Sequence, residues 1–401
     1  MKIYNFLNFL KMEVKKQENT LNLIASENYS SINSIIYASS SFINKYTEGY
    51  PKNRYYSGCK FFDLIENKSI IESQNLFNVN FSNVQPHSGS QANYSALQSL
   101  ININDKILSL DLKSGGHLTH GFFKNFSGSY FTIINYFLNK NNLIDNNIIN
   151  LIIKKEKPKL LILGYSSYHG DLDWNYLRKI SKKNNCYILS DISHISGFVS
   201  SGIYKNPIEF SDIVTSTTHK TLRGIKGGII LSNNYRYYKK INSLVFPGQQ
   251  GGCISNFIAG KFFSFKESNN FNFINYTKQI ILNSKIMLKT FINRGYNAII
   301  NNTNNHMFLI SLNKINLNSL FVEKYLEKYG IMLNKNFLPK DNKNSINPSG
   351  IRIGLSCLTT RKMKNLEIEL IGNYICDIIE KKKNNLFINI RILCKKFPIY
   401  K

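Results

Sequence analysis

The chain has 401 residues, a formal net charge of +27 and a hydrophobic content of 43%. This length is enough to bury a substantial core and suggests two domains. No apolar run approaches the ~20 residues of a membrane-spanning helix, and Met1–Lys16 lacks the apolar segment of a secretory signal. The six cysteines are scattered without a Cys-x-x-Cys pair, which argues against a zinc site or a disulfide framework and suits a reducing cytosol. We therefore expect a cytoplasmic protein with no metal site and no membrane association.

The positive charge raises the question of a nucleic-acid partner. The lysines, however, are spread along the chain instead of gathering into one arm. Lys, Asn, Ile, Phe and Tyr are all abundant, and these residues have A/T-rich codons, so codon composition is the simpler explanation of the charge. We expect no nucleic-acid partner.

The N-terminal segment, 1–76, is rich in aromatic residues and turns and suggests an arm that packs against something else. Beyond it, apolar runs alternate with helix-like stretches. The strands that we expect are Leu160–Gly164, Cys186–Asp191, Ile213–Thr217 and Gly228–Ser232, and the helices are Ala92–Leu100 and Asp173–Lys183. Repeated strand–helix–strand units predict an α/β fold with a mostly parallel sheet and helices on both faces.

After about Phe271 the pattern changes to that of a smaller α/β domain. It predicts a long helix at Asn275–Asn293, a strand at His306–Leu312 and a closing helix from Arg361 to about Lys382. The chain is thus divided into the arm, a large domain at 77–270 and a small domain at 271–401.

Lys220 is the first candidate for chemistry. It follows the β-branched run that ends at Thr217 and precedes Gly224, Gly227 and Gly228. A lysine delivered from a buried strand into a tight glycine turn is desolvated, which lowers its pKa and frees the amine to attack a carbonyl carbon. Pyridoxal phosphate is the main carbonyl cofactor held in this way. Taken alone, Lys220 is better explained as a solvated turn residue, so the cofactor hypothesis depends on the other motifs of the chain.

Asp191 ends the strand that precedes the lysine strand. Ligands of parallel sheets bind at the carboxyl ends of the strands, so Asp191 and Lys220 are expected to face one crevice. A buried carboxylate there keeps a pyridine nitrogen protonated, which makes the ring an electron sink. The alternative for a strand-end aspartate is a helix N-cap.

Three further segments fit the same cofactor. The segment His87–Asn93 precedes a helix and resembles an anion site, although such sequences are more often plain N-caps. His117 lies between glycines, where an imidazole can stack on a flat ring or act as a structural hydrogen-bonding group. Arg352 lies inside an apolar strand, where it suits a substrate carboxylate or a structural salt bridge.

Taken together, the motifs of the chain resemble those of the serine hydroxymethyltransferase (glycine hydroxymethyltransferase) family, in family order and spacing over nearly the whole chain. They are Leu23–Tyr29, Lys45–Pro51, Arg54–Cys59, His87–Asn93, Thr217–Thr221, Phe246–Gly252 and Cys394–Tyr400. The resemblance implies a fold-type I pyridoxal-phosphate transferase of one-carbon metabolism and glycine biosynthesis. In this family, serine and tetrahydrofolate become glycine and 5,10-methylenetetrahydrofolate.

The resemblance also assigns roles to residues that match the family's motifs. For the cofactor, Lys220 would bond to its carbonyl carbon, Asp191 would pair with its pyridine nitrogen, His117 would stack on its ring, Ser166 and His194 would lie near its phenolic oxygen, and Ser88, Gly89 and Ser90 would hold its phosphate. For the substrates, Ser26 and Arg352 would grip the amino-acid carboxylate, His219 and Thr217 would line the reacting centre, Glu48 would transfer a proton with help from Tyr46 and Tyr56, and the folate would touch Leu112, Gly116, His117, Leu118, Asn344, Ser345 and Ile346.

Subunit sharing is part of the same resemblance. It implies a homodimer in which residues of one chain reach the neighbouring site, namely Tyr46, Glu48, Tyr56, Gly251 and Gly252. The chain departs from the family at three places: Ile225–Lys226 replaces Pro-Arg, Cys253 replaces a proline, and Ser193 replaces a small apolar residue without expected consequence. Lys226 keeps a charge but loses a planar fork, so efficiency is more in doubt than reaction class.

Two alternatives stay open at this point. A pyridoxal-phosphate threonine or allo-threonine aldolase shares the carbon–carbon cleavage but does not use folate; the segment with Tyr46 and Glu48 favours the transferase. A basic nucleic-acid-binding or decayed non-catalytic protein would carry no cofactor chromophore bound through Lys220.

Overall fold

The computed structural model describes residues 3–313, 317–343, 346–382 and 385–400, and it divides into two compact units. The central unit is Ser30–Thr277, and the terminal unit combines Met1–Tyr29 with Lys278–Lys401. The first residues of the expected arm therefore belong to the same unit as the C-terminal part of the chain. The helix α11 (Phe271–Asn293) contributes residues to both units.

A seven-stranded sheet forms the middle of the central unit, in the order β4-β10-β9-β8-β7-β5-β6 among the described residues. Its strands are β4 (Phe81–Asn83), β5 (Lys106–Leu110), β6 (Thr132–Tyr136), β7 (Leu160–Gly164), β8 (Tyr187–Asp191), β9 (Ile213–Thr217) and β10 (Gly228–Ser232). The strands from β6 to β9 are parallel, whereas β10 is antiparallel to both β9 and β4. The mostly parallel sheet that the sequence predicts is confirmed.

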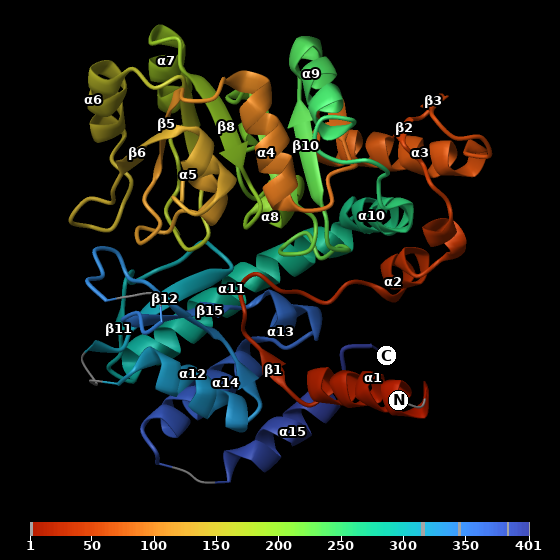
Figure 1. Ribbon diagram of the computed structural model, residues 1–401. Helices are drawn as coiled ribbons and strands as arrows, with labels where there is room; N and C mark the ends of the chain where they lie inside the picture. The colour runs from red at the N-terminus through yellow and green to blue at the C-terminus, as the bar shows by residue number, and fades with distance from the viewer. Residues whose placement is uncertain (1–2, 314–316, 344–345, 383–384, 401) are drawn as a thin grey trace. The chain divides into compact units, whose positions relative to one another are not determined.

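Helices α4 (Gly89–Leu100) and α9 (Tyr235–Val245) pack on one face of this sheet (Figure 1). Their apolar residues meet every second strand residue, as the two-residue period of a strand requires. This core consists of Ala92, Ala96, Leu97, Leu100, Ile101, Ile107, Phe131, Leu160, Ile162, Leu189, Ile213, Ile230, Ile241 and Val245. The alternate strand residues are buried too, which is typical of a sheet covered on both faces.

The central unit contains further helices besides α4 and α9. They are α2 (Ile32–Ala38), α3 (Lys60–Phe77), α5 (Phe126–Tyr130), α6 (Asn146–Glu156), α7 (Trp174–Lys183), α8 (Ser196–Ser200) and α10 (Ser255–Ser268), with 3-10 turns at Ser41–Asn44, Leu118–His120 and Pro207–Glu209 and a hairpin of β2 (Gly49–Tyr50) and β3 (Asn53–Arg54). α10 packs against α2 and α3 (Figure 1). The segment expected as an aromatic, turn-rich arm is therefore largely helical.

Helix starts in the central unit follow capping chemistry. The Asp145 side chain accepts hydrogen bonds from backbone N–H groups at the start of α6, and Asp173 and Asn234 do the same for α7 and α9. Such caps satisfy N–H groups that have no partner within the helix. They explain why the predicted helix at Asp173–Lys183 begins where it does.

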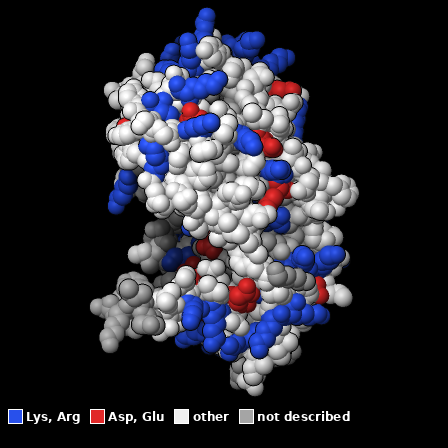
Figure 2. All heavy atoms as spheres, turned by 90° about the vertical axis from the view of Figure 1, so that its right-hand side faces the viewer, with Lys and Arg blue, Asp and Glu red and all other residues white. Residues whose placement is uncertain are grey.

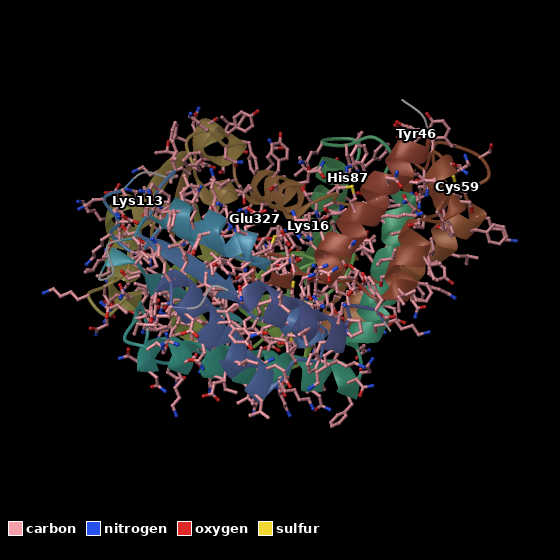
Figure 3. The ribbon with its side chains drawn as sticks, turned by 90° about the horizontal axis from the view of Figure 1, so that it is seen from below. Lys16, Tyr46, Cys59, His87, Lys113 and Glu327 are labelled. Carbon is pink, nitrogen blue, oxygen red and sulfur yellow. The ribbon has the colours of Figure 1, made fainter. Side chains whose placement is uncertain are left out.

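The terminal unit is built around an antiparallel four-stranded sheet in the order β11-β12-β15-β14. Its strands are β11 (Asn297–Ala298), β12 (Met307–Ser311), β14 (Asn334–Asn336) and β15 (Gly350–Gly354), and its helices are α1 (Ile3–Glu18), α12 (Ser319–Lys328), α13 (Ser356–Thr360), α14 (Asn365–Ile379) and α15 (Leu386–Lys396). The short strand β1 (Leu21–Asn22) pairs with β13 (Ile331–Met332). Lys16 of α1 lies 4.0 Å from Glu327 of α12 (Figure 3).

The prediction of a closing helix from Arg361 is wrong in two respects: the helix starts later, at Asn365, and another helix follows it. Lys362 adopts a left-handed backbone conformation (φ 66°), which ends α13 and separates it from α14. The described chain then continues into α15. Within the described residues, no helix is long and apolar enough to cross a membrane.

Lys and Arg side chains appear over several parts of the one face that Figure 2 presents. Figure 2 shows Lys and Arg side chains scattered among other residues on the face that it presents, with few Asp and Glu between them. No single basic stripe stands out on this face, as the spread of lysines along the sequence indicates.

Candidate active site

One group of predicted site residues in the central unit lies at one edge of the sheet. Asp191 ends β8 between Gly164 of β7 and Thr215 of β9. Ser166 follows β7 and Lys220 follows β9, so both leave the sheet at this carboxyl edge. Because β4 and β9 are each antiparallel to β10, they run in the same direction, and the segment after β4 also leaves at this edge. The strand topology therefore brings these segments to the same edge of the sheet, as the sequence predicts.

Asp191 is the most strongly held carboxylate at this edge. Its Oδ1 accepts hydrogen bonds from the Ser193 hydroxyl (2.6 Å) and backbone N–H (3.0 Å). Its Oδ2 accepts from the Asn93 amide at 2.8 Å and lies 3.0 Å from His120 Nε2. Burial alone would raise the pKa of Asp191, but His120, together with His117 and Asn93, outweighs burial and holds this pKa well below its usual range. Asp191 is thus an ionised carboxylate in a buried place, and it does not cap a helix with this side chain.

A chain of hydrogen bonds connects this carboxylate to the predicted stacking histidine. Asn93 donates to Asp191 and to the Thr119 hydroxyl at 2.8 Å each. The Thr119 hydroxyl lies 2.7 Å from His117 Nδ1, and the Thr119 backbone N–H donates to the same nitrogen. The orientation of the His117 ring is therefore fixed from the sheet side.

Sequence reasoning missed His120, Asn93 and the role of Ser193. His120 is only 2% exposed and makes the direct contact with Asp191, whereas His117 contacts it through intermediates. Together, His117, His120 and Asp191 place their potential ligand atoms within 4.8 Å of one another. The spacing of the two histidines, three residues apart, could have indicated that His120 also belongs to the site. The 3-10 turn Leu118–His120 brings both rings to the same side.

Ser88 and Gly89 begin α4. The Ser88 hydroxyl accepts from the Gln91 N–H, so it is an N-cap, as the simpler interpretation predicts. A Cβ at Gly89 would lie 2.6 Å from Thr217 Cγ2, so only glycine fits against the end of β9. Ser90 is exposed in the first turn. The N–H groups and the dipole of this twelve-residue helix favour an anion at the same place.

Lys220 is buried, with 7% of its surface exposed. The interpretation of Lys220 as a solvated turn residue is therefore wrong. Its turn is closed by hydrogen bonds from the Arg223 N–H to the Lys220 carbonyl and from the Gly224 N–H to the Thr218 carbonyl. His194 is buried as well, and the Ser166 N–H donates to the Gly115 carbonyl at 2.7 Å.

His219, next to the lysine, is held neutral. Burial, reinforced by the charges of Lys220, Lys226 and Lys261, lowers the pKa of His219 to about 4. Its Nδ1 is buried and no hydrogen-bond partner in the described chain satisfies it. A neutral imidazole with an unsatisfied ring nitrogen beside a buried amine suits a site that receives a polar ligand.

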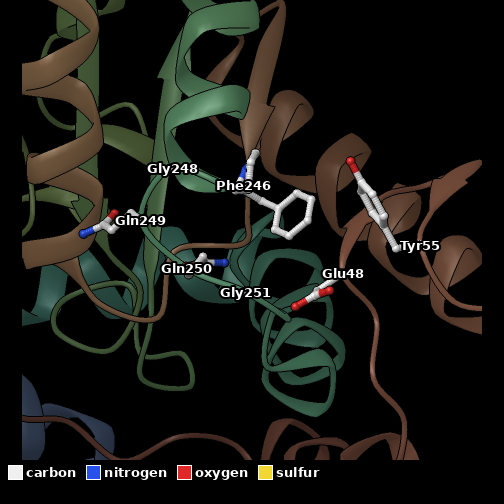
Figure 4. A pocket seen from close by; sticks show the side chains of 8 residues that line it. Glu48, Tyr55, Phe246, Gly248, Gln249, Gln250 and Gly251 are labelled. Carbon is white, nitrogen blue, oxygen red and sulfur yellow. The ribbon is translucent and has the colours of Figure 1, made fainter.

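A second group of predicted residues lies around the hairpin of the central unit. A Cβ at Gly251 would lie 3.0 Å from Glu48 Oε1, and one at Gly252 would lie 3.3 Å from the Tyr46 ring. The Tyr46 and Tyr56 rings are 5.2 Å apart and tilted by 56°. Glu48 also lines a pocket of about 490 Å³. Figure 4 shows Glu48 and Tyr55 on one side of it and the segment Phe246–Gly251 on the other.

The predicted carboxylate-binding residues lie in the terminal unit. Arg352 is in β15, opposite Leu309 and Asn334, and burial lowers the pKa of its guanidinium to about 10. The backbone before Ser26 packs on the end of this strand, because the Gly354 N–H donates to the Leu23 carbonyl at 2.8 Å. Among the predicted folate contacts, Leu118 and Ile346 are exposed and Gly116 is buried, while Leu112 is partly buried; Asn344 and Ser345 lie outside the described residues.

The chain is similar to known proteins over nearly its whole length. The family profile described as "Serine hydroxymethyltransferase" matches residues 3–375. A "Serine hydroxymethyltransferase" of Wigglesworthia glossinidia brevipalpis is 43% identical over 407 residues, which cover 100% of this chain and 96% of the relative. The same name is carried by a relative from Francisella tularensis subsp. novicida (strain U112), 41% identical over 398 residues, which cover 98% of this chain and 95% of the relative. The chain belongs to the serine hydroxymethyltransferase family.

Family membership confirms the predicted class of enzyme and its cofactors. Serine hydroxymethyltransferases are fold-type I transferases that use pyridoxal phosphate and tetrahydrofolate to interconvert serine and glycine in one-carbon metabolism. The residues at the sheet edge fit this cofactor. An ionised, buried carboxylate suits a protonated pyridine nitrogen, a buried amine suits a carbonyl carbon, and the buried Nδ1 atoms of His120 and His219 have no protein partner in the described chain.

Proposed function

We propose that the reversible transfer of the serine hydroxymethyl carbon to tetrahydrofolate takes place at the carboxyl edge of the central sheet, on the residues that surround Asp191 and Lys220. The observation that carries this assignment is the pairing of a buried carboxylate, held ionised by four hydrogen bonds, with a buried lysine in the turn that follows the neighbouring strand. Pyridoxal phosphate, when bound, supplies an electron sink for bonds broken at the amino-acid α-carbon.

Each residue at this edge has one task toward the cofactor. Lys220 would hold the carbonyl carbon of the cofactor through its buried amine, a nucleophile suited to that carbon. Asp191 keeps the proton on the pyridine nitrogen, and its low pKa means that it stays ionised while doing so. His117, whose ring is oriented by Thr119, would stack on the cofactor ring. The remaining contacts are Ser166 and His194 near the phenolic oxygen and Ser88, Gly89 and Ser90 at the phosphate.

The substrates require a carboxylate site and a proton-transfer group. Arg352, with Ser26, binds the amino-acid carboxylate, since a buried guanidinium favours a planar anion. Glu48 moves a proton near the hydroxymethyl carbon, and Tyr46 and Tyr56 orient it. Thr217 and neutral His219 line the reacting centre, and the folate lies against Leu112, Gly116, His117, Leu118 and the segment Asn344–Ile346.

A homodimer with shared sites is part of the proposal. Aromatic side chains around Glu48 are exposed on the single chain: Tyr46 is 55%, Tyr55 is 74% and Tyr56 is 45% exposed. Neighbouring helices also expose apolar residues, among them Ile32 and Phe61. A monomer rarely exposes such a patch, so a second copy is the natural cover. The cytoplasm is the proposed location, because all six cysteines are free thiols.

The cofactor assignment is tested by absorbance. Purified protein with pyridoxal phosphate should absorb near ~420 nm, as a lysine-bound carbonyl cofactor does. The band should disappear in Lys220→Ala and persist in Lys226→Ala, a matched exposed lysine of the same turn. A band that survives Lys220→Ala would assign the cofactor to another amine.

Folate dependence separates the transferase from an aldolase. Serine cleavage should require tetrahydrofolate, and Glu48→Gln should lose this activity while it keeps the absorbance band. Mixing inactive Lys220→Ala with inactive Glu48→Gln tests the shared site. If each site uses Lys220 from one chain and Glu48 from the other, about one quarter of the sites regain both residues by random pairing. Cleavage of serine at full rate without folate would contradict the transferase assignment. No recovery of activity in the mixture would contradict the shared site.

A further inference from the structure

Lys261 is a fully enclosed cation in the central unit. It lies in α10 and is only 2% exposed. Its Nζ donates to three main-chain carbonyls, those of Val84 (2.7 Å), Pro86 (3.0 Å) and Gly228 (3.0 Å). An ammonium has three N–H donors, and here each one meets a carbonyl oxygen.

The three carbonyls belong to the two segments that frame the candidate site. Val84 and Pro86 connect β4 with the Ser88 cap, at the proposed phosphate position. Gly228 begins β10, directly after the turn that carries Lys220. The two segments touch, since the Gly228 N–H donates to the Pro86 carbonyl at 3.0 Å. One ammonium thus ties the phosphate segment to the lysine turn.

The lysine turn leaves room for this side chain. A Cβ at Gly227 would overlap Cε of Lys261 and lie 2.7 Å from its Nζ. Gly227 does not have a positive φ, so space, and not backbone conformation, makes glycine necessary here. Gly227 and Lys261 therefore fit as a pair.

Placing a lysine here has an electrostatic cost and an electrostatic effect. Burial lowers the pKa of Lys261 to about 7, against the opposing influence of Cys253 and Glu66. Charge–dipole bonds to three carbonyls compensate for part of the lost hydration. Burial and the Lys261 charge also lower the pKa of His87, which stands between Pro86 and Ser88. The positive field of Lys261 therefore reaches the segment where an anion is expected.

We propose that Lys261 is a positioning residue for cofactor binding: its ammonium serves as a built-in monovalent cation that locks the phosphate segment onto the Lys220 turn. This inference rests on the proposed placement of the cofactor phosphate at Ser88–Ser90. A potassium or ammonium ion has a size and charge similar to those of the Lys261 head group, so such an ion should occupy the three-carbonyl cradle when the side chain is truncated.

The first experiment measures the affinity of the apo-protein for pyridoxal phosphate in a buffer whose only added cation is choline. Lys261→Ala and Lys261→Met should each bind at least about tenfold more weakly than the wild type. Added ammonium or potassium should restore Lys261→Ala but not Lys261→Met, whose side chain fills the cradle. Lys266→Met, an exposed lysine of the same helix, is the matched control and should bind like the wild type.

The second experiment tests the pair with a double-mutant cycle. Gly227→Ala alone should weaken cofactor binding, because its Cβ displaces the Lys261 side chain. In the Lys261→Ala background the same change has room, so its added effect should vanish. Additive effects, wild-type affinity of Lys261→Ala, or a loss that neither ammonium nor potassium repairs would each overturn the proposal.

Failure of the inference is separable from failure of the proposed function. If the wild type bound no pyridoxal phosphate, the proposed function would fail. The cradle would still be tested by the thermal stability of apo Lys261→Ala, which should rise with ammonium while that of Lys261→Met should not. If Lys261→Ala is unfolded in choline, its refolding on addition of ammonium supports the cradle. The cradle is refuted if Lys261→Ala stays unfolded in ammonium and in potassium and Gly227→Ala binds pyridoxal phosphate as the wild type does.

Discussion

Ser193→Ala is the perturbation that most directly tests how Asp191 is kept ionised. The Ser193 hydroxyl donates to Asp191 Oδ1 at 2.6 Å and accepts from the Thr217 N–H at 3.0 Å. Alanine removes both bonds and keeps the backbone N–H bond of residue 193 to the same oxygen. A hydrogen bond to a charged acceptor contributes about 1.5–3 kcal/mol to stability, which corresponds to about one to two units in the pKa of Asp191.

The measurement is the free energy of unfolding of the apo-protein in urea. We expect Ser193→Ala to lower it by about 1.5–3 kcal/mol at pH 7. The folded-state pKa of Asp191 is depressed, so bonds to its carboxylate stabilise the fold above the unfolded pKa of about 4, and this stabilisation is lost as the pH falls toward the folded value. The difference between variant and wild type should therefore be largest near neutral pH and shrink toward acid.

Ser196→Ala is the matched control. Ser196 is fully buried in α8 near the same edge, but its hydroxyl oxygen makes no hydrogen bond within the described chain. Removing it should leave stability unchanged within about 0.5 kcal/mol or raise it. Equal effects of the two substitutions would show that the Ser193–Asp191 bond contributes nothing beyond packing, and the reasoning on Asp191 would be refuted.

Three further substitutions test the surroundings of the site. Arg54→Met should destabilise the protein by about 3–5 kcal/mol in urea unfolding, because it leaves buried Glu66 without its 2.5 Å ion pair; a loss below about 1 kcal/mol would contradict this. His219→Gln should reduce the loss of stability between about pH 6.5 and 4, since the folded pKa of about 4 lies below the unfolded value and protons favour the unfolded chain in that window; an unchanged pH profile would mean that His219 does not titrate there. Gly89→Ala should weaken pyridoxal-phosphate binding because its Cβ clashes with Thr217 Cγ2, and adding Thr217→Ser should restore part of the affinity; binding of Gly89→Ala at wild-type strength would exclude the clash.

The sheet and its functional edge could be predicted from the sequence. The strands Leu160–Gly164, Ile213–Thr217 and Gly228–Ser232 are confirmed with their predicted bounds, because short apolar or β-branched runs give a strong local signal. Asp191 and Lys220 at adjacent strand ends then follow from the parallel order. Local pattern and the rules of parallel topology were enough to bring these residues to one edge.

The hydrogen-bond partners could not be predicted in the same way. Asn93 and Asp191 are far apart in the sequence, and nothing local marks Asn93 as the group that links Asp191 to Thr119. Ser193 was expected to be a change without consequence, yet its hydroxyl contacts the carboxylate. Such contacts depend on side-chain directions between α4, the Leu118–His120 turn and β8, which become known only once the elements are packed.

Three buried Lys and Arg side chains of this chain have the same role: each donates hydrogen bonds to several main-chain carbonyls. Arg54 donates to the Thr47 and Gly49 carbonyls on either side of Glu48, and Arg361 of the terminal unit donates to several carbonyls between chain segments. Lys261 does the same for the phosphate segment and the lysine turn. These carbonyls lie in loops, at the starts of strands or in the last turn of a helix, where regular backbone pairing ends. A buried carbonyl left unsatisfied there costs about 1–3 kcal/mol. One multivalent donor satisfies two or more at once and fixes the segments in register, which an apolar side chain of equal volume cannot do. In the central unit, the segments fixed in this way are those that carry Glu48, Ser88 and Lys220, so buried cations hold the backbone from which the proposed chemistry is built.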